Sequence, residues 1–401
     1  QPITESLHTS NRYQQAQASA MFLLQSFGSN GSGQLGIGHK NDVSTPQPVI
    51  LPSSISGSTN PLHRPKRIVA GGNHTLLLLS SGELLWTGDA TTGACGRINQ
   101  DVNDDLRPEF RPVDLSPLPK RTKVNHVAAT WAASVVVVSA EEGESIRAAR
   151  GSTQVYSFGS GDKGELGLGP GLTQTIEPTL IPNFPPPGTQ IVDLAACMGH
   201  VVAVLSTGEV WGWGQGRKGQ LGNPVVAAVQ SPRRIDGVNF KVVKAVCGRE
   251  FTCLFGSSET GELMILGADK WGIRTQAPLN VKGWKEVGAG WGSVFVLKDD
   301  GTLLSWGRDD HGQLSRSGLG RVEHIAVGSE HTMALTDDGD LLAWGWGEHG
   351  NCGPIRQNTS GEKGQRNLIA SNKALHCEQG MEIGMISAGC ATSWVSLEKK
   401  A

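Results

Sequence analysis

A short glycine-spaced pattern recurs seven times along this chain of 401 residues, and it limits what the chain can fold into. In each copy an aromatic residue, an apolar residue or Thr precedes a glycine, and a second glycine follows five residues later. The first glycines of the copies are Gly28, Gly88, Gly159, Gly214, Gly267, Gly307 and Gly345. Successive copies lie 60, 71, 55, 53, 40 and 38 residues apart. A fixed pattern between variable spacers predicts structural repeats whose insertions lie in loops.

Each copy is followed by a second element, which reads as a short apolar strand between two turns. Residues 328–335 (GSEHTMAL), for example, lead to Asp338-Gly339. No helical period of useful length is present. Short strands with glycine turns at this repeat length predict an all-β fold, a seven-bladed β-propeller over residues 21–401. Residues 1–20 are predicted to be an extension of unknown role.

The composition supports a packed core and excludes several classes of protein. Glycine supplies 54 residues, but 11 tryptophans and a hydrophobic fraction of 38% argue against disorder. A formal charge of −2 without a basic run gives no sign of direct nucleic-acid binding. Seven cysteines without a Cys-x-x-Cys pair argue against a disulfide framework and a structural zinc site. No apolar stretch approaches the length of a membrane span. We therefore expect a cytoplasmic or nuclear protein with no cofactor, no bound metal and no membrane contact.

The repeat carries a resemblance to a known family. Copies such as Trp213-Gly214 to Gly219-Gln220-Leu221-Gly222 resemble the regulator-of-chromosome-condensation repeat, and the resemblance covers residues 22–397. It implies a seven-bladed propeller of that type.

A narrower resemblance is carried by four segments: residues 26–39, 71–74, 344–354 (WGWGEHGNCGP) and 389–395 (GCATSWV). They are similar to the fungal alpha-tubulin-suppressor, or killer-toxin-insensitivity, proteins. This resemblance implies a one-to-one partnership with a small zinc-binding electron-carrier protein. It further implies a role in Elongator-dependent modification of the transfer RNA wobble uridine and in diphthamide synthesis on translation elongation factor two. On this basis the chain is expected to bind and not to catalyse.

Two other functions remain open within the wider family. The founding member is a guanine-nucleotide exchange factor for a small nuclear GTPase, although this chain has no basic amino-terminal tail. The plant ultraviolet receptors use repeated Gly-Trp-Arg-His-Thr motifs, whereas the equivalents here are Gly-Gly-Asn-His-Thr and Gly-Ser-Glu-His-Thr. The missing Trp-Arg pair argues against a light sensor.

Residues that recur at one repeat position are expected to be structural, and residues that break the pattern are better functional candidates. Three Gly-x-Gly-x-x-Gly strings, at 31–36, 159–164 and 214–219, belong to the repeat and lack the following helix of a dinucleotide site. His74, His200 and His331 share one position, which favours packing between blades.

Tryptophan is enriched in binding hot spots, and Glu348 and His349 break the repeat most clearly. The predicted partner-binding residues are Trp291, Glu330, His331, Trp346, Glu348, His349 and Trp394. No catalytic, cofactor-binding or metal-binding residue is predicted.

Overall fold

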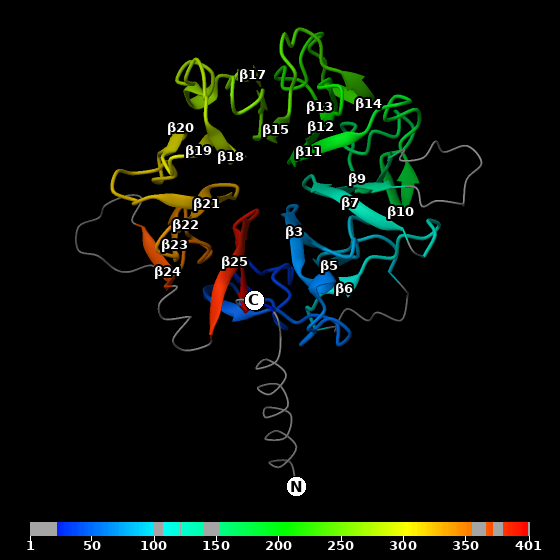
Figure 1. Ribbon diagram of the computed structural model, residues 1–401. Helices are drawn as coiled ribbons and strands as arrows, with labels where there is room; N and C mark the ends of the chain where they lie inside the picture. The colour runs from blue at the N-terminus through cyan, green and yellow to red at the C-terminus, as the bar shows by residue number, and fades with distance from the viewer. Residues whose placement is uncertain are drawn as a thin grey trace.

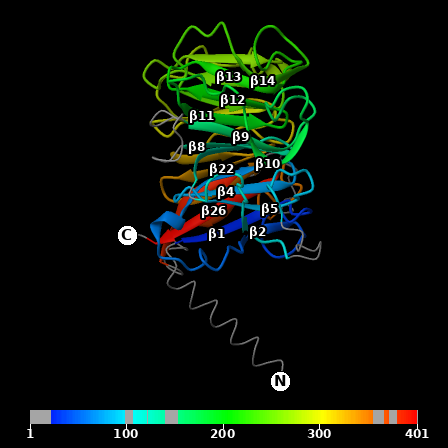
Figure 2. The same ribbon diagram turned by 90° about the vertical axis from the view of Figure 1, so that its right-hand side faces the viewer.

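The computed structural model describes residues 22–98, 107–120, 122–139, 153–354, 366–371 and 380–399. Seven antiparallel sheets stand side by side in a ring (Figure 1). Figure 2 shows the ring edge-on. The predicted all-β, seven-bladed propeller is confirmed, while the predicted extension at residues 1–20 lies outside the described residues. Among the described residues, no helix is long and apolar enough to cross a membrane.

We number the blades in chain order. Blade 1 holds β3 (Pro65–Ala70), β4 (His74–Leu79), β5 (Leu84–Gly88) and β6 (Arg111–Pro112); blade 2 holds β7 (Lys123–Ala129), β8 (Ala133–Ser139), β9 (Thr153–Ser160) and β10 (Gln174–Leu180). Blade 3 holds β11 (Ile191–Cys197), β12 (His200–Leu205), β13 (Val210–Gln215) and β14 (Ala228–Arg234); blade 4 holds β15 (Lys244–Cys247), β16 (Phe251–Phe255) and β17 (Leu263–Gly267). Blade 5 holds β18 (Trp284–Ala289), β19 (Ser293–Lys298) and β20 (Leu303–Gly307); blade 6 holds β21 (Val322–Val327), β22 (His331–Thr336), β23 (Asp340–Gly345) and β24 (Asn367–Ser371). Two short 3-10 turns, η1 (Pro61–His63) and η2 (Lys270–Gly272), lie in loops.

Blade 7 closes the ring with strands from both ends of the described chain. It combines β25 (Met381–Ala388) and β26 (Thr392–Lys399) with β1 (Phe22–Gly28) and β2 (Val43–Pro48). Strands β1 and β26 pair antiparallel along their length, from Phe22 opposite Glu398 to Gly28 opposite Thr392. The red and blue ends of the chain consequently meet in one sheet (Figure 1).

The core lies between the faces of neighbouring blades. Strands β4, β12 and β22 are buried at every position, because both faces of each sheet pack against another blade. The signature leucines Leu35, Leu166 and Leu221 are buried as expected from the repeat, and Leu314 is half-buried.

Each signature turn is held by the blade that follows it. Trp213 Nε1 donates to the carbonyl oxygen of Glu165 at 3.0 Å, and Trp344 Nε1 donates to that of Gln313 at 2.9 Å. Trp306 makes the same bond to Ile273 at 2.8 Å. The tryptophan before the signature glycine is therefore a structural residue, which bonds the turn of the preceding blade.

The three recurring histidines also join blades, as predicted for packing residues. In each case Nε2 lies beside a hydroxyl of the next blade: His74 at 3.2 Å from Ser134, His200 at 3.0 Å from Thr252 and His331 at 2.8 Å from Ser393. These hydroxyls donate their protons to backbone carbonyls, so Nε2 must be the donor to each hydroxyl. Burial lowers the pKa of each histidine to about 4, so each imidazole is neutral at pH 7.

Candidate binding face at the mouth of the central channel

One residue of each blade stands at the rim of the central channel, in the turn between the innermost strand and the next. These seven rim residues are Gly72, Trp131, Met198, Arg249, Trp291, Ser329 and Cys390. Their backbones repeat a single geometry, since Trp131 N donates to Met198 O and Trp291 N to Ser329 O, both at 2.7 Å. Their side chains share no common type. A fixed backbone with varied side chains is the pattern expected for a recognition surface displayed on a repeat scaffold.

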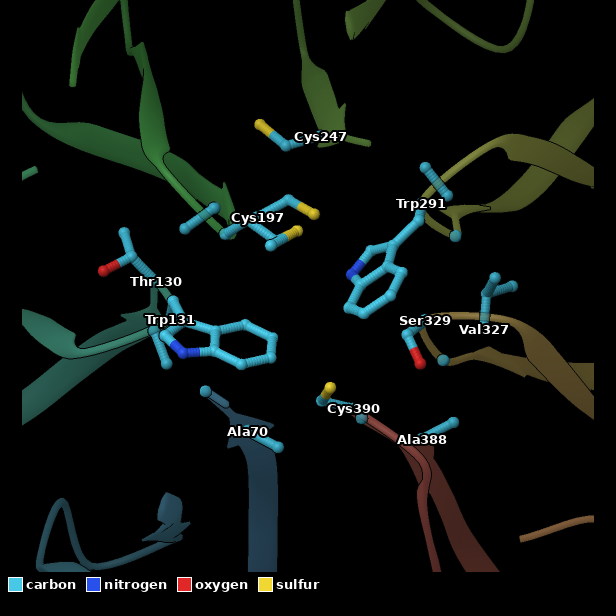
Figure 3. A pocket seen from close by; sticks show the side chains of 18 residues that line it. Ala70, Thr130, Trp131, Cys197, Cys247, Trp291, Val327, Ser329, Ala388 and Cys390 are labelled. Atoms are coloured by element: carbon cyan, nitrogen blue, oxygen red, sulfur yellow. The ribbon is translucent and has the colours of Figure 1, made fainter. Parts of the chain in front are cut away.

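The rim encloses a small pocket of about 120 Å³. Below the rim its wall consists of small residues such as Ala70, Ala196 and Ala388. Trp131 and Trp291 point toward one another across the opening (Figure 3), with ring centroids 6.2 Å apart and planes tilted by 42°. The two indoles therefore meet across the channel mouth.

Cys197, Cys247 and Cys390 also line this pocket (Figure 3). Burial raises the pKa of Cys197 to about 12, which keeps it a thiol and a poor nucleophile at neutral pH. No three His, Cys, Asp or Glu side chains within the described ranges come together as a metal site. The pocket thus favours packing and recognition over covalent chemistry.

A larger groove of about 360 Å³ adjoins the rim between blades 4 and 5. Trp271 and Trp291 line it, together with the cations Arg249, Lys270 and Arg308. Arg249 lies over Trp291 at 5.7 Å from the ring centroid, and Lys270 and Arg308 each lie 5.3 Å from that of Trp271. Cations held against indole faces are partly desolvated and oriented.

A polar network fixes the outer wall of this groove. Arg308 bonds both carboxylate oxygens of Asp310, at 2.7 and 2.9 Å, and Glu330 at 2.5 Å. The hydrogen bond from Arg308 holds the pKa of Asp310 far below its usual range. Arg308 also lies 5.7 Å from the ring of Trp346, which stacks on His311 with centroids 4.2 Å apart and planes within 7°. We call the surface formed by Trp271, Trp291, Trp346, Arg249, Lys270 and Arg308 the tryptophan face.

Trp271 adopts a backbone conformation that bulky side chains rarely take, with φ of 65°. Its side chain is 41% exposed, so burial of the indole does not account for this conformation. Strained residues of this kind concentrate at functional sites. This conformation makes Trp271 a candidate functional residue of the tryptophan face.

Four of the predicted partner-binding residues have side chains available on or beside this face. Trp291 and Trp346 belong to it, while Glu348 and His349 are exposed beside Trp346. His349 is also engaged within the chain, because its Nδ1 lies 2.8 Å from Oδ2 of Asp42 in blade 7.

The other three predicted residues are buried. Glu330 lines the groove but is only 7% exposed, and it serves to hold Arg308 and Gln313. His331 and Trp394 are 2% and 0% exposed, so their side chains are not available at the surface for a partner to contact. Trp394 packs edge-on against Phe110 in the core, with centroids 5.8 Å apart.

Sequence reasoning left four residues of the tryptophan face out of the predicted set: Trp271, Arg249, Lys270 and Arg308. It also left out Trp131 at the channel mouth. Two signals could have found three of these residues. Trp131 and Arg249 occupy the rim position, where the seven blades carry six different residue types. Trp271 lies in the most divergent signature copy, which ends in Gly272-Ile-Arg-Thr.

The two tryptophans Trp394 and Trp346 should differ sharply on replacement. We expect Trp394→Ala to lower the free energy of unfolding by about 3–5 kcal/mol, because it leaves a cavity in the core. Trp346→Ala should cost far less, since its side chain is already 37% exposed. Urea unfolding followed by circular dichroism measures both, and equal losses would contradict the assignment of Trp394 to the core.

Comparison with known proteins agrees with this architecture. Residues 23–395 match the RCC1-like domain. The chain is 29% identical over 395 residues to an RCC1 repeat-containing protein of Schizosaccharomyces pombe, covering 94% of this chain and 99% of that protein. It is 27% identical over 319 residues to the secretion-regulating guanine nucleotide exchange factor of Mus musculus, covering 74% of this chain and 62% of that one.

Among solved structures, Prp20p of Saccharomyces cerevisiae, studied for its binding properties to Gsp1p and histones, has a similar fold. It superposes with a TM-score of 0.74 at 20% identity, over 97% of this chain and 95% of that one. Seven glycine-spaced repeats, seven blades and a family match that spans nearly the whole propeller lead to one conclusion: the chain belongs to the RCC1-like domain family.

Proposed function

We propose that this protein is a non-catalytic binding platform whose tryptophan face holds a small zinc-binding electron-carrier protein in a one-to-one complex. The observation that carries the proposal is that the residues breaking the repeat gather on one side of the channel mouth, on blades 4 to 6. Tryptophan and arginine are the residue types most enriched in protein-binding hot spots.

The choice of partner rests on the narrower sequence resemblance. Residues 344–354, which carry much of that resemblance, supply Trp346 to the face and Glu348 and His349 beside it. Through this partner the protein would support Elongator-dependent modification of transfer RNA and diphthamide synthesis, in the cytoplasm and the nucleus.

The geometry of the face suits rigid recognition. Arg308 is fixed by two carboxylates and Trp346 by its stack on His311, so little rotamer freedom is lost when a partner binds. Arg249 and Lys270, by contrast, have no carboxylate at ion-pair distance among the described residues. These cations would steer an acidic partner surface, and raising the salt concentration should slow association more than it speeds dissociation.

We expect Trp291→Ala and Trp346→Ala each to weaken the complex at least tenfold, about 1.4 kcal/mol, because each removes an indole anchor. Isothermal titration with the zinc-loaded small protein measures this. Lys163→Ala is the control, because Lys163 is an exposed residue of a signature turn in blade 2, outside the tryptophan face. Unchanged affinity in both tryptophan variants would place the binding surface elsewhere, and no complex at all would refute the proposed partner.

A guanine-nucleotide exchange factor is the second candidate. It is favoured by the 27% identity to the secretion-regulating exchange factor over 74% of this chain. The test is release of a fluorescent guanine nucleotide from a small nuclear GTPase. Acceleration by catalytic amounts of this protein would support exchange activity, and an unchanged rate would leave the binding-platform proposal standing alone.

A further inference from the structure

Each innermost strand carries a second equivalent position, five residues before the rim residue of its blade, and we call these seven residues the ring residues. These ring residues are Arg67, His126, Asp193, Lys244, Glu286, His324 and Met385. In six of the seven strands the pairing register shifts just before the ring residue, as between Pro65 and Arg67. Such bulges re-aim the side chain that follows them. A β-bulge therefore precedes nearly every ring residue, and all of these residues except Met385 are ionisable.

Both carboxylates of the ring are already engaged. Asp193 accepts from Lys244 Nζ at 2.7 Å and from the backbone N–H of Ala245 at 2.9 Å. Glu286 lies 2.5 Å from His324 Nδ1 and accepts from the backbone N–H of Ile325 at 2.9 Å. The charge of each carboxylate is thus compensated by a basic side chain of the following blade, Lys244 for Asp193 and His324 for Glu286.

Arg67 is left without a counterion of its own. Its Nη2 donates to the carbonyl oxygen of Leu194 at 3.2 Å, and within the described ranges no carboxylate lies at ion-pair distance. Burial lowers the pKa of Arg67, with the charge of Asp193 opposing this only in part. A half-buried guanidinium without a paired anion favours an anion from outside the chain.

A cavity of about 560 Å³ lies directly against Arg67, and residues of blades 1, 2 and 3 line it. Its polar lining includes Lys66, Arg67, Asn125, His126, Ser139 and Thr153. The lining residues that the structure describes include two cations and no carboxylate. Lys66 is the bulged residue itself and is exposed.

We propose that this cavity binds a small phosphate-bearing anion, with the Arg67 guanidinium and the Lys66 ammonium as its principal ligands. The planar guanidinium can donate two parallel hydrogen bonds to phosphate oxygens, and the ammonium adds a mobile point charge. The Asn125 amide and the Ser139 hydroxyl lie in the same lining as further polar groups. The volume falls within the usual range for small-molecule sites. This site is remote from the tryptophan face and does not depend on the partner proposed for that face.

The test is isothermal titration of the full chain with inorganic phosphate, pyrophosphate and AMP, each against sodium chloride of equal ionic strength. We expect saturable binding of at least one phosphate probe, weakened at least fivefold by Lys66→Gln and abolished by Arg67→Met. Tighter binding of AMP than of inorganic phosphate would point to a nucleotide-sized ligand, and equal binding to the phosphate group alone. Lys285→Gln is the matched control, because Lys285 is the bulged residue of β18 on the far side of the channel.

Thermal unfolding without ligand separates a ligand site from a structural one. If Arg67 serves to bind an anion, the melting temperature of the unliganded Arg67→Met variant should equal or exceed that of the parent protein. If this variant does not fold, Lys66→Gln alone decides, since its side chain is exposed. The proposal is overturned if no phosphate probe binds saturably. It is also overturned if Lys66→Gln binds these probes as tightly as the parent protein and the Lys285→Gln control do.

Discussion

Gly307→Ala is expected to lower the free energy of unfolding by more than about 3 kcal/mol, or to prevent folding altogether. Gly307 has φ of 110°, and a Cβ there would lie 2.4 Å from the carbonyl oxygen of Gly292. This oxygen already accepts a hydrogen bond from the backbone N–H of Arg308 at 2.7 Å, so it cannot move aside without weakening that bond. The same conflict faces the first glycine of all seven signatures, at 2.3–2.6 Å from a backbone oxygen. The measurement is urea unfolding, or soluble yield where no folded protein is obtained.

Gly171→Ala is the matched control. Gly171 has no atom within 4 Å of its would-be Cβ, and its φ lies outside the left-handed range. Alanine there should cost nothing, or should stabilise by up to about 1 kcal/mol by restricting the unfolded chain. Similar stability of the two variants would show that the signature glycine does not serve the close backbone approach described above.

Acid should weaken the fold well above the pH at which carboxylates protonate. The three inter-blade histidines titrate near pH 4 in the native state but near 6.5 when unfolded. Between these values the unfolded chain binds more protons, so stability falls as the pH falls through this window. Each histidine contributes a slope of up to about 1.4 kcal/mol per pH unit. Urea unfolding at half-unit steps from pH 7.5 to 4 measures the sum.

Gln in place of His74, His200 and His331 removes the titrating groups but keeps a donor for the hydroxyl of the next blade. This triple variant should show a flatter dependence of stability on pH below 6.5. His324 works in the opposite direction, because its hydrogen bond to Glu286 raises its pKa. A parent curve as flat as that of the variant would rule out the neutral, donating histidines.

The fold could be predicted because the repeat reflects the backbone conformation of a few consecutive residues. A glycine that precedes another glycine by five residues indicates a turn, and seven such turns at this spacing indicate seven blades. The buried histidines also follow from their shared repeat position. Aligning the repeats further would have placed Trp394 in the core, since it occupies the position of Leu76, Val202 and Met333, all of them 0% exposed.

The candidate site could be predicted only in part, because its contacts join residues far apart in the repeat. Trp344 and Trp346 differ by two positions, yet one is 1% and the other 37% exposed. Nothing in the chain order shows that Arg308 meets both Trp271 and Trp346. The unpaired Arg67 is harder still to foresee, because the pairing of Asp193 with Lys244 depends on the order of blades around the ring.

The sharing of blade 7 between distant strands has a consequence for biosynthesis. Strand β1 leaves the ribosome before the other described strands, but its partner β26 arrives only after blades 1 to 6 have been made. During that interval the unpaired edge of β1 is a template for any strand that can reach it. Two nascent copies could each complete the other by exchanging β25 and β26. Chaperone demand and dimeric by-products should therefore depend on how quickly residues 381–399 follow, more than on the stability of the finished ring.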